Sequence, residues 1–278
     1  MNLQSSQWTV AVDARMPAGV PLDKKVEADG RVTYRCYAID TTSGISTETV
    51  YDEQCRPVRI LKRSTTGSQA EVHLDPETGR RRRLSEVSKA PDGSTVSREV
   101  AYLDDDRQSE IVTILTARGL LGKLIERHHT GPRTTYQGET TYDSEGNPSQ
   151  SINQHMQPGS GALVHREQIY WVREGQRAMT EHFHFNEVGM LTRYVKVLHY
   201  LHAGPFSEET QDFHPERGHL VRRELVAYSP DGFQTCLDVL FYAEDGSVAE
   251  RKSTFFDCLG RPIAIRAAGR EIGNSLWP

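Results

Sequence analysis

The hydrophobic and polar positions of this chain fall into short segments that are rich in Val, Thr, Tyr and Phe. The clearest are residues 31–37 (RVTYRCY), 194–200 (YVKVLHY), 233–242 (FQTCLDVLFY) and 247–256 (SVAERKSTFF). β-Branched and aromatic residues favour extended strands. The pattern therefore predicts β-strands of about 8 to 10 residues that are separated by turns.

Single glycines mark these turns at a nearly constant interval. Turns such as SPDG (229–232) and AEDG (243–246) place Pro or Asp early and Gly last, where a positive φ closes a hairpin. Less regular turn positions reach back to Gly30. One strand plus one turn, repeated along the chain, gives an antiparallel meander. The regular series, with spacings of 14 or 15 residues, is Gly146, Gly161, Gly175, Gly189, Gly204, Gly218, Gly232, Gly246 and Gly260.

Two passages are less regular. Residues 107–127 hold the most apolar run, and its second half could form two turns of amphipathic helix. Gly119 and Gly122 would each cost such a helix about 1 kcal/mol relative to alanine, which favours two strands, 111–116 and 123–129. Residues 155–162 (HMQPGSGA) are predicted to form a longer hairpin connection.

The number of turns limits the architecture. Up to eighteen turns give as many as nineteen strands, and a flat sheet of that size would be roughly 90 Å wide. Open sheets of this width curl, split or close. We therefore expect an all-β, single-domain antiparallel meander of β-hairpin repeats, curled into a barrel-like or shell-like form. It would cover residues 26–278, after an irregular lead-in at 1–25 with one strand at 8–12.

Neither face of the predicted strands is cleanly apolar. In residues 247–256 one face carries Val248, Glu250 and Lys252, and the other carries Ala249 and Arg251. Such strands suit a single-layer sheet whose concave side is partly filled or wet. Centring the turn on 243–246 places Asp238 opposite Arg251, an exposed pair that stabilises a sheet only slightly.

Composition excludes several classes of protein. The chain has 278 residues, 36% of them hydrophobic, and a net charge of −5, which gives no general attraction to nucleic acid or an anionic membrane. It shows neither an apolar run long enough for a membrane helix nor a secretion signal, so we expect a soluble cytoplasmic protein. The four cysteines lack zinc-site spacing and are expected to be reduced and structural: Cys36, Cys55, Cys236 and Cys258.

The candidate catalytic residues are His182 and His184. They lie two positions apart on a predicted strand, so both point to one face. A third group could come from His165 on the preceding strand, or from His199 or His202 on the following one. One interpretation is a metal site or an acid/base cluster inside a cup. The other is a pair of partly solvated histidines. His128 and His129 are adjacent, face opposite sides and are not expected to share an ion.

Residues 80–83 form the strongest basic feature, four consecutive arginines. On a strand, Arg80 and Arg82 would face one way and Arg81 and Arg83 the other. They form either a solvated strand that pairs with nearby acidic turns or a docking site for an acidic partner or phosphate. No catalytic triad, phosphate-binding loop or dinucleotide motif is visible, so we expect no cofactor.

Four segments resemble the YD repeats of Rhs-type proteins, in which an aromatic residue and Asp precede Gly, Arg and an apolar residue. They are YDEQCRPVRI (51–60), YDSEGNPSQS (142–151), FNEVGMLTRY (185–194) and FDCLGRPIAI (256–265). In that family the repeats form hairpins of a long sheet that spirals into a hollow shell around a toxin. This chain departs from the pattern: Cys55 replaces Gly, the turns at 102–106 and 213–218 fit loosely, and same-edge turns lie about 28 residues apart, more than in the family.

Two functional hypotheses follow. The chain is a protein-binding β-repeat module that resembles immunity or antitoxin proteins, with a toxin or effector as partner. Alternatively, it is a small-molecule enzyme or carrier whose concave cavity is lined by aromatic residues and by His182 and His184. Neither hypothesis involves nucleic acid or a membrane.

Overall fold

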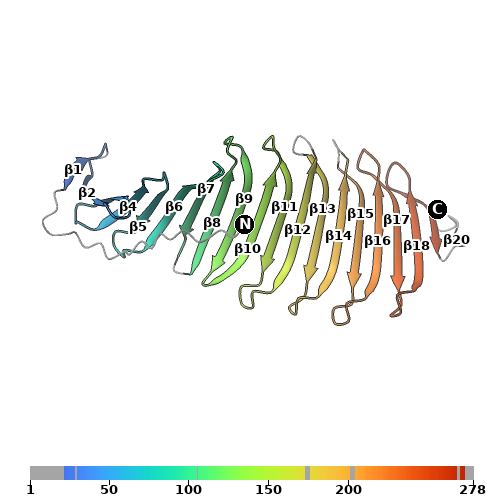
Figure 1. The fold of residues 1–278 in the computed structure, drawn as a ribbon. Helices are drawn as coiled ribbons and strands as arrows, with labels where there is room; N and C mark the ends of the chain where they lie inside the picture. The colour runs from blue at the N-terminus through green and yellow to red at the C-terminus, as the bar shows by residue number, and fades with distance from the viewer. Residues whose placement is uncertain are drawn as a thin grey trace. The chain divides into compact units, whose positions relative to one another are not determined.

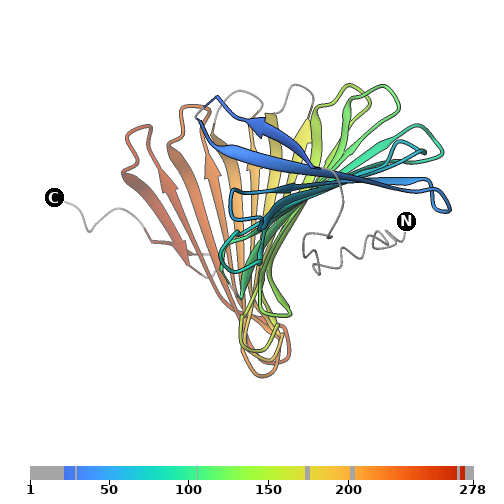
Figure 2. The same cartoon turned by 90° about the vertical axis from the view of Figure 1, so that its left-hand side faces the viewer.

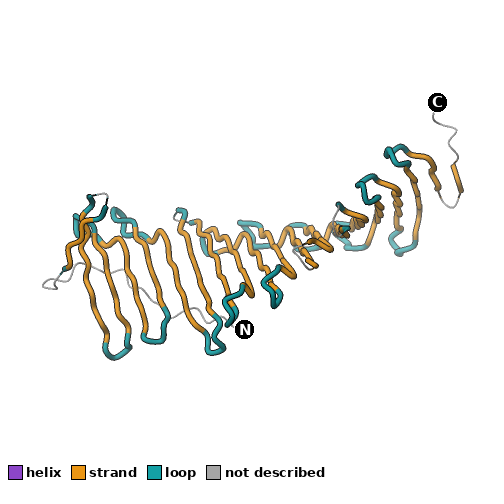
Figure 3. The backbone as a smooth tube through the Cα atoms, turned by 90° about the horizontal axis from the view of Figure 1, so that it is seen from above, coloured by secondary structure: helices purple, strands orange, loops and turns teal. Residues whose placement is uncertain are grey.

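The computed structural model describes residues 22–28, 30–104, 106–172, 176–200, 204–267 and 270–272. The chain divides into two compact units, residues 1–132 and 133–278. Every regular element in the described ranges is a β-strand (Figure 3). No helix that could span a membrane occurs in this part of the chain.

In its described residues, the first unit is an antiparallel meander of nine strands, in which each strand pairs with the next along the chain. Figure 2 shows its strand direction rotating steadily from β1 toward β9, the twist expected of a wide sheet. β1 begins inside the stretch that was predicted to be irregular. The strands are β1 (Asp23–Val26), β2 (Val32–Asp40), β3 (Ile45–Tyr51), β4 (Pro57–Ser64), β5 (Gln69–Leu74), β6 (Arg81–Lys89), β7 (Thr95–Tyr102), β8 (Arg107–Leu115) and β9 (Leu121–Thr130).

The second unit repeats this arrangement with longer strands, which lie side by side in chain order in Figure 1. The strands are β10 (Arg133–Tyr142), β11 (Pro148–Met156), β12 (Leu163–Val172), β13 (Gln176–Phe185), β14 (Leu191–His199), β15 (Pro205–Phe213), β16 (Leu220–Tyr228), β17 (Gln234–Tyr242), β18 (Val248–Phe256), β19 (Pro262–Ala267) and β20 (Arg270–Ile272).

The predicted all-β meander is confirmed, and within each unit the sheet stays open, curled rather than closed into a barrel. The apolar run forms β8 and β9, which agrees with the two-strand interpretation and not with a helix. The connection after β11 is a hairpin loop, but it is shorter than predicted, because His155 and Met156 still belong to the strand. The predicted strand at 8–12 and Gly175 lie outside the described residues.

One turn geometry recurs in all four segments that resemble YD repeats. The residue after the aromatic accepts hydrogen bonds on its side-chain oxygen from two backbone N–H groups, two and four residues later. Asp52 accepts them at 3.0 and 2.8 Å, and Asp257 at 2.9 Å each. Asp143 and Asn186 bond in the same way. The Asp or Asn side chain therefore accepts hydrogen bonds from turn amides that would otherwise bond to water.

The arginine of the motif closes the same turn. The Nε–H groups of Arg56 and Arg261 each donate to the aspartate at 2.8 Å. Cys55, which stands where the pattern has Gly, adopts a φ of 59°, while Gly260 has a φ of 75° at the equivalent position. The turn geometry therefore persists even where a non-glycine residue must take the left-handed conformation.

Beside many of these turns the pairing between the two strands shifts by one residue. One predicted ion pair is affected by such a shift. Between Phe241 and Tyr242 the pairing shifts, so that Asp238 faces Ser253, and Arg251 faces Leu240. Arg251 still reaches diagonally to Asp238, with 2.7 Å between its Nη2 and Oδ2. The predicted ion pair is therefore present, but the predicted direct opposition is wrong. The turn closes between Ala243 and Ser247, one residue longer than predicted, and a β-bulge then adds one more residue, so Asp238 faces Ser253 instead of Arg251.

The first unit contains a continuous core. One row of directly paired side chains crosses β4 to β7: Ile60, Val72, Leu84 and Val100, each at most 7% exposed. Beside this row, Arg98 bridges the shielded carboxylates of Glu86 and Glu110, at 2.9 and 2.6 Å.

The second unit buries far less. Among its described residues, the buried side chains are Ser151, Ile169, Thr180, Val226 and Thr254. The strand registers place all five in one row across one face of the sheet. Most other side chains on both faces remain at least partly exposed, which agrees with the mixed polarity predicted for these strands.

Candidate functional site

Four histidines meet on the face of the second unit that also carries the buried row. His155 on β11 is directly opposite His165 on β12, which is opposite His184 on β13. His182 lies two residues before His184 and therefore points to the same side. We call this group of four side chains the histidine ladder.

The imidazole rings of the histidine ladder are in contact. The His165 ring centroid lies 4.7 Å from that of His184, 5.6 Å from that of His182 and 5.7 Å from that of His155. Tyr136 on β10 packs against the outer ring, with 5.0 Å between its centroid and that of His155. His155 is exposed, and the other three histidines are half-buried.

The surroundings of the ladder disfavour positive charge. Burial, followed by repulsion from the neighbouring histidines, lowers the pKa of His165. Burial, His182 and the guanidinium of Arg193 lower the pKa of His184 in the same way. The Nε2 atom of His165 is buried and has no hydrogen-bond partner. At neutral pH the rings of His165 and His184 are therefore uncharged.

One carboxylate lies beside the ladder. Glu167 on β12 is directly opposite His182, and its Oε1 is 3.9 Å from the Nδ1 of that ring. The other oxygen of Glu167 accepts a hydrogen bond of 2.8 Å from the side-chain amide of Asn153, which fixes its position.

The structure brings the predicted pair, His182 and His184, together with His165, one of the third groups considered in the sequence. His199 lies elsewhere, 3.3 Å from the hydroxyl of Thr180, and His202 lies outside the described residues. His155 was missed because it was assigned to a loop; a β11 extended by two residues would have found it. In the described ranges, no group of three or more His, Cys, Asp or Glu residues is arranged to hold a metal ion.

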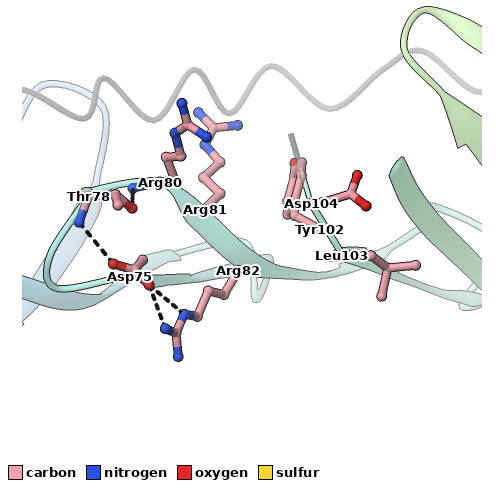
Figure 4. Close-up of a pocket in the computed structure, with 8 residues that line it drawn as sticks. All are labelled: Asp75, Thr78, Arg80, Arg81, Arg82, Tyr102, Leu103 and Asp104. Carbon is pink, nitrogen blue, oxygen red and sulfur yellow. Dashed lines mark hydrogen bonds and ion pairs between the residues drawn. The ribbon is translucent and has the colours of Figure 1, made fainter. Parts of the chain in front are cut away.

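The arginine run in the first unit borders an open hollow of about 820 Å³ (Figure 4). The register shifts so that Arg81 pairs with Leu74 and Arg83 with His73. Arg81 and Arg83 therefore lie on opposite faces, which corrects the predicted alternation. In Figure 4, Arg80 and Arg81 point to one side and Arg82 to the other. The lining residues are Asp75, Thr78, Arg80, Arg81, Arg82, Tyr102, Leu103 and Asp104.

Acidic side chains balance this basic stretch. Arg82 donates from Nε to Asp75 at 3.0 Å, and Arg83 donates to Glu99 at 2.8 Å. The backbone N–H of Thr78, and then Arg82, hold the pKa of Asp75 far below its usual range. These pairs agree with the interpretation of the run as a solvated strand that pairs with acidic neighbours. A second hollow, of about 440 Å³, lies near Arg35 and Arg59, and neither hollow is lined by His182 or His184.

Apolar side chains project from one edge of the second unit. Phe206 lies at the start of β15, and Phe233 and Leu259 lie in the β16–β17 and β18–β19 turns. All three are at the same ends of the strands and are 37%, 47% and 65% exposed. The Tyr200 hydroxyl donates to the Tyr228 carbonyl at 3.1 Å, which ties two of these turns together across 28 residues. We call Phe206, Phe233 and Leu259 the apolar edge.

No family model and no curated protein matches the sequence. Among solved structures, the chain is similar to one in the crystal structure of TcdB2-TccC3-TEV, with 13% identity and a TM-score of 0.20, over 88% of this chain and 17% of that one. A chain of TcdB2-TccC3 without its hypervariable C-terminal region is 12% identical, with a TM-score of 0.20, over 90% of this chain and 17% of that one. A chain of TcdB2-TccC3-Cdc42 is 8% identical, with a TM-score of 0.12, over 88% of this chain and 22% of that one. The chain spans less than a quarter of the length of these chains.

Proposed function

We propose that this chain is a β-hairpin-repeat module that binds another protein, in the manner of an immunity or antitoxin protein. The observation that carries the proposal is the apolar edge of the second unit, where Phe206, Phe233 and Leu259 are exposed to solvent. Isolated exposed apolar residues are ordinary. These three recur at successive turns along one side of the sheet, so a partner that lies along this side contacts all of them.

The chemistry of this edge fits a protein partner. Burying a large apolar side chain stabilises a complex by about 1.5 to 3 kcal/mol, and aromatic residues are enriched where proteins bind one another. The charges beside the edge are matched internally, since Arg261 donates to Asp257. Recognition by shape and apolar contact is therefore favoured over recognition of a highly charged ligand. We place the complex in the cytoplasm, with a toxin or effector as the partner.

The test is a binding measurement with the protein encoded beside this one in the genome. Phe233→Ser combined with Leu259→Ser is expected to weaken the complex by about 10-fold or more, since about 1.4 kcal/mol is tenfold in affinity. The matched control is Val188→Ser, because Val188 is 78% exposed but lies at the β13–β14 turn on the opposite edge. Equal loss in the two variants, or no loss in either, would contradict the proposal.

A second candidate function rests on the histidine ladder. Imidazoles that are gathered on one face can act as acid/base groups or bind a small molecule, so His182 and His184 remain candidates for a catalytic or carrier site. Mass spectrometry of the native protein would test this. A bound small molecule that is retained by the wild-type protein and lost in His182→Ala with His184→Ala would support it over the protein-binding role.

A further inference from the structure

The histidine ladder concentrates titratable groups without enough opposite charge to balance them. Its four rings come from three consecutive strands, β11, β12 and β13, and the His165 ring lies within 6 Å of each of the other three. Each of the three strands depends on its neighbours for backbone hydrogen bonds, so repulsion across the ladder acts directly on the pairing of the sheet.

The groups that face the ladder from adjacent strands offer little compensation. β10 contributes the phenol of Tyr136, β11 the amide of Asn153 and β12 the carboxylate of Glu167. β14 contributes Arg193, directly opposite His184, and this arginine is already paired with Asp212 at 2.7 Å. Glu167 is therefore the carboxylate available to four imidazoles, and it can balance one proton.

We propose that the histidine ladder is a pH-sensitive latch: near neutral pH its rings stack and hold β11, β12 and β13 together, and in mild acid protonation within the ladder loosens these three strands. The loosening is confined to the strands that carry the ladder. The core row of the first unit, which contains aliphatic side chains, does not take part.

The direction in which stability changes with pH follows from the linkage between proton binding and folding. The pKa values of His165 and His184 are lowered in the folded protein. The unfolded state therefore binds more protons below about pH 6.5, and stability falls as the pH falls through that range. Each pKa unit of displacement corresponds to about a tenfold change in the opening equilibrium.

Amide hydrogen exchange on the whole chain tests the latch. Between pH 7.5 and pH 5.5, after correction for intrinsic exchange rates, protection in peptides from β11, β12 and β13 is expected to drop about tenfold or more. Protection in peptides from β4 to β7 is expected to stay within about twofold, because these strands lack the ladder. Equal changes in both sets of peptides, or no change in β11 to β13, would overturn the proposal.

Substitutions locate the sensor. His165→Phe keeps an aromatic ring but removes the central proton site, and it is expected to abolish most of the acid response. The control His128→Phe removes an exposed histidine that is paired with Glu126 in the first unit, and it should leave the response unchanged. Glu167→Gln removes the balancing carboxylate and should enlarge the loss of amide protection in acid. This second variant keeps the test decisive if His165→Phe does not fold. An unaltered response in Glu167→Gln would contradict the latch.

Discussion

The two units build the same hairpins but bury different rows of side chains. In the first unit the shielded row that crosses β4 to β7 is Ile60, Val72, Leu84 and Val100. In the second unit the shielded row is Ser151, Ile169, Thr180, Val226 and Thr254, in which hydroxyl groups alternate with aliphatic ones. Burial of apolar area stabilises in proportion to that area. The first unit therefore contributes a core, while the second leaves most of its side chains available to contact solvent or a partner.

This difference also separates the candidate sites. The histidine ladder and the apolar edge both lie in the second unit, where few side chains are needed for packing. Charged residues form internal pairs in both units, such as Arg98 with Glu110 in the first and Arg193 with Asp212 in the second. A sheet with a weak core can carry partly exposed titratable groups, since these groups cost less free energy when water still reaches them.

The largest expected effect separates the two shielded rows. Ile60→Ala should destabilise the first unit by about 2 to 5 kcal/mol, because it leaves a cavity beside Val72. Ile169→Ala, between Ser151 and Thr180, should cost about half as much, because fewer apolar atoms surround it. Urea denaturation of each variant measures both values. Ile111→Ala, at an exposed position on β8, is the control for the first variant and should have a small effect. Equal losses at Ile60 and Ile169 would remove the distinction between the units.

A smaller effect is expected from the charged neighbours of the first core. Arg98→Met leaves the carboxylates of Glu86 and Glu110 shielded without their shared guanidinium. Arg98 is itself 40% exposed, so solvent reduces the penalty to about 1 to 3 kcal/mol. Arg83→Met removes an exposed pair with Glu99 and should change the unfolding free energy by less than about 1 kcal/mol. Thermal unfolding at low and high salt compares the two variants. An equal loss of unfolding free energy in Arg98→Met and Arg83→Met would show that burial of the ion-pair network does not matter.

The smallest expected effect is common to both units and lies in the turns. Hydrogen bonds from turn amides and from arginine lower the pKa values of Asp104 in the first unit and of Asp257 in the second. The stabilisation is present above the unfolded pKa, near 3.9, and is lost as the pH falls through the folded values. Asp257→Asn, which cannot ionise, should lower the melting temperature slightly above pH 5 and leave it little changed near pH 2, so that the loss of stability in acid becomes smaller. A melting curve between pH 2 and pH 7 measures the effect. An unchanged loss of stability in acid would mean that the turn does not contribute.

Much of the candidate site could be predicted, but not its centre. Local alternation was enough to place His182 and His184 on one face, since side chains two apart on a strand always share a side. The joining of His165 to them depended on the register between β12 and β13. The addition of His155 depended on where β11 ends, a boundary that the residue types between 155 and 162 do not specify.

The bulges explain the remaining misplacements. A shift between His73 and Leu74 placed Arg81 and Arg83 on opposite faces, although they were predicted to share one. A longer turn and a second shift, between Phe241 and Tyr242, together moved the partner of Asp238 by two residues, so Arg251 stays on the same face at a diagonal position. A single extra residue reverses which face a side chain occupies, so a strict period of two fails beyond each bulge.

Turn chemistry and strand order follow from local residue types alone. A side chain that accepts from turn amides, such as Asp52 or Asn186, a residue with positive φ and a following strand former favour a hairpin. Consecutive hairpins in a meander need no distant contact. Several strands together determine the pairing register, the burial of each row of side chains and the contacts among the histidines. Tertiary structure decides them, because a one-residue bulge costs little locally but changes every pairing that follows it.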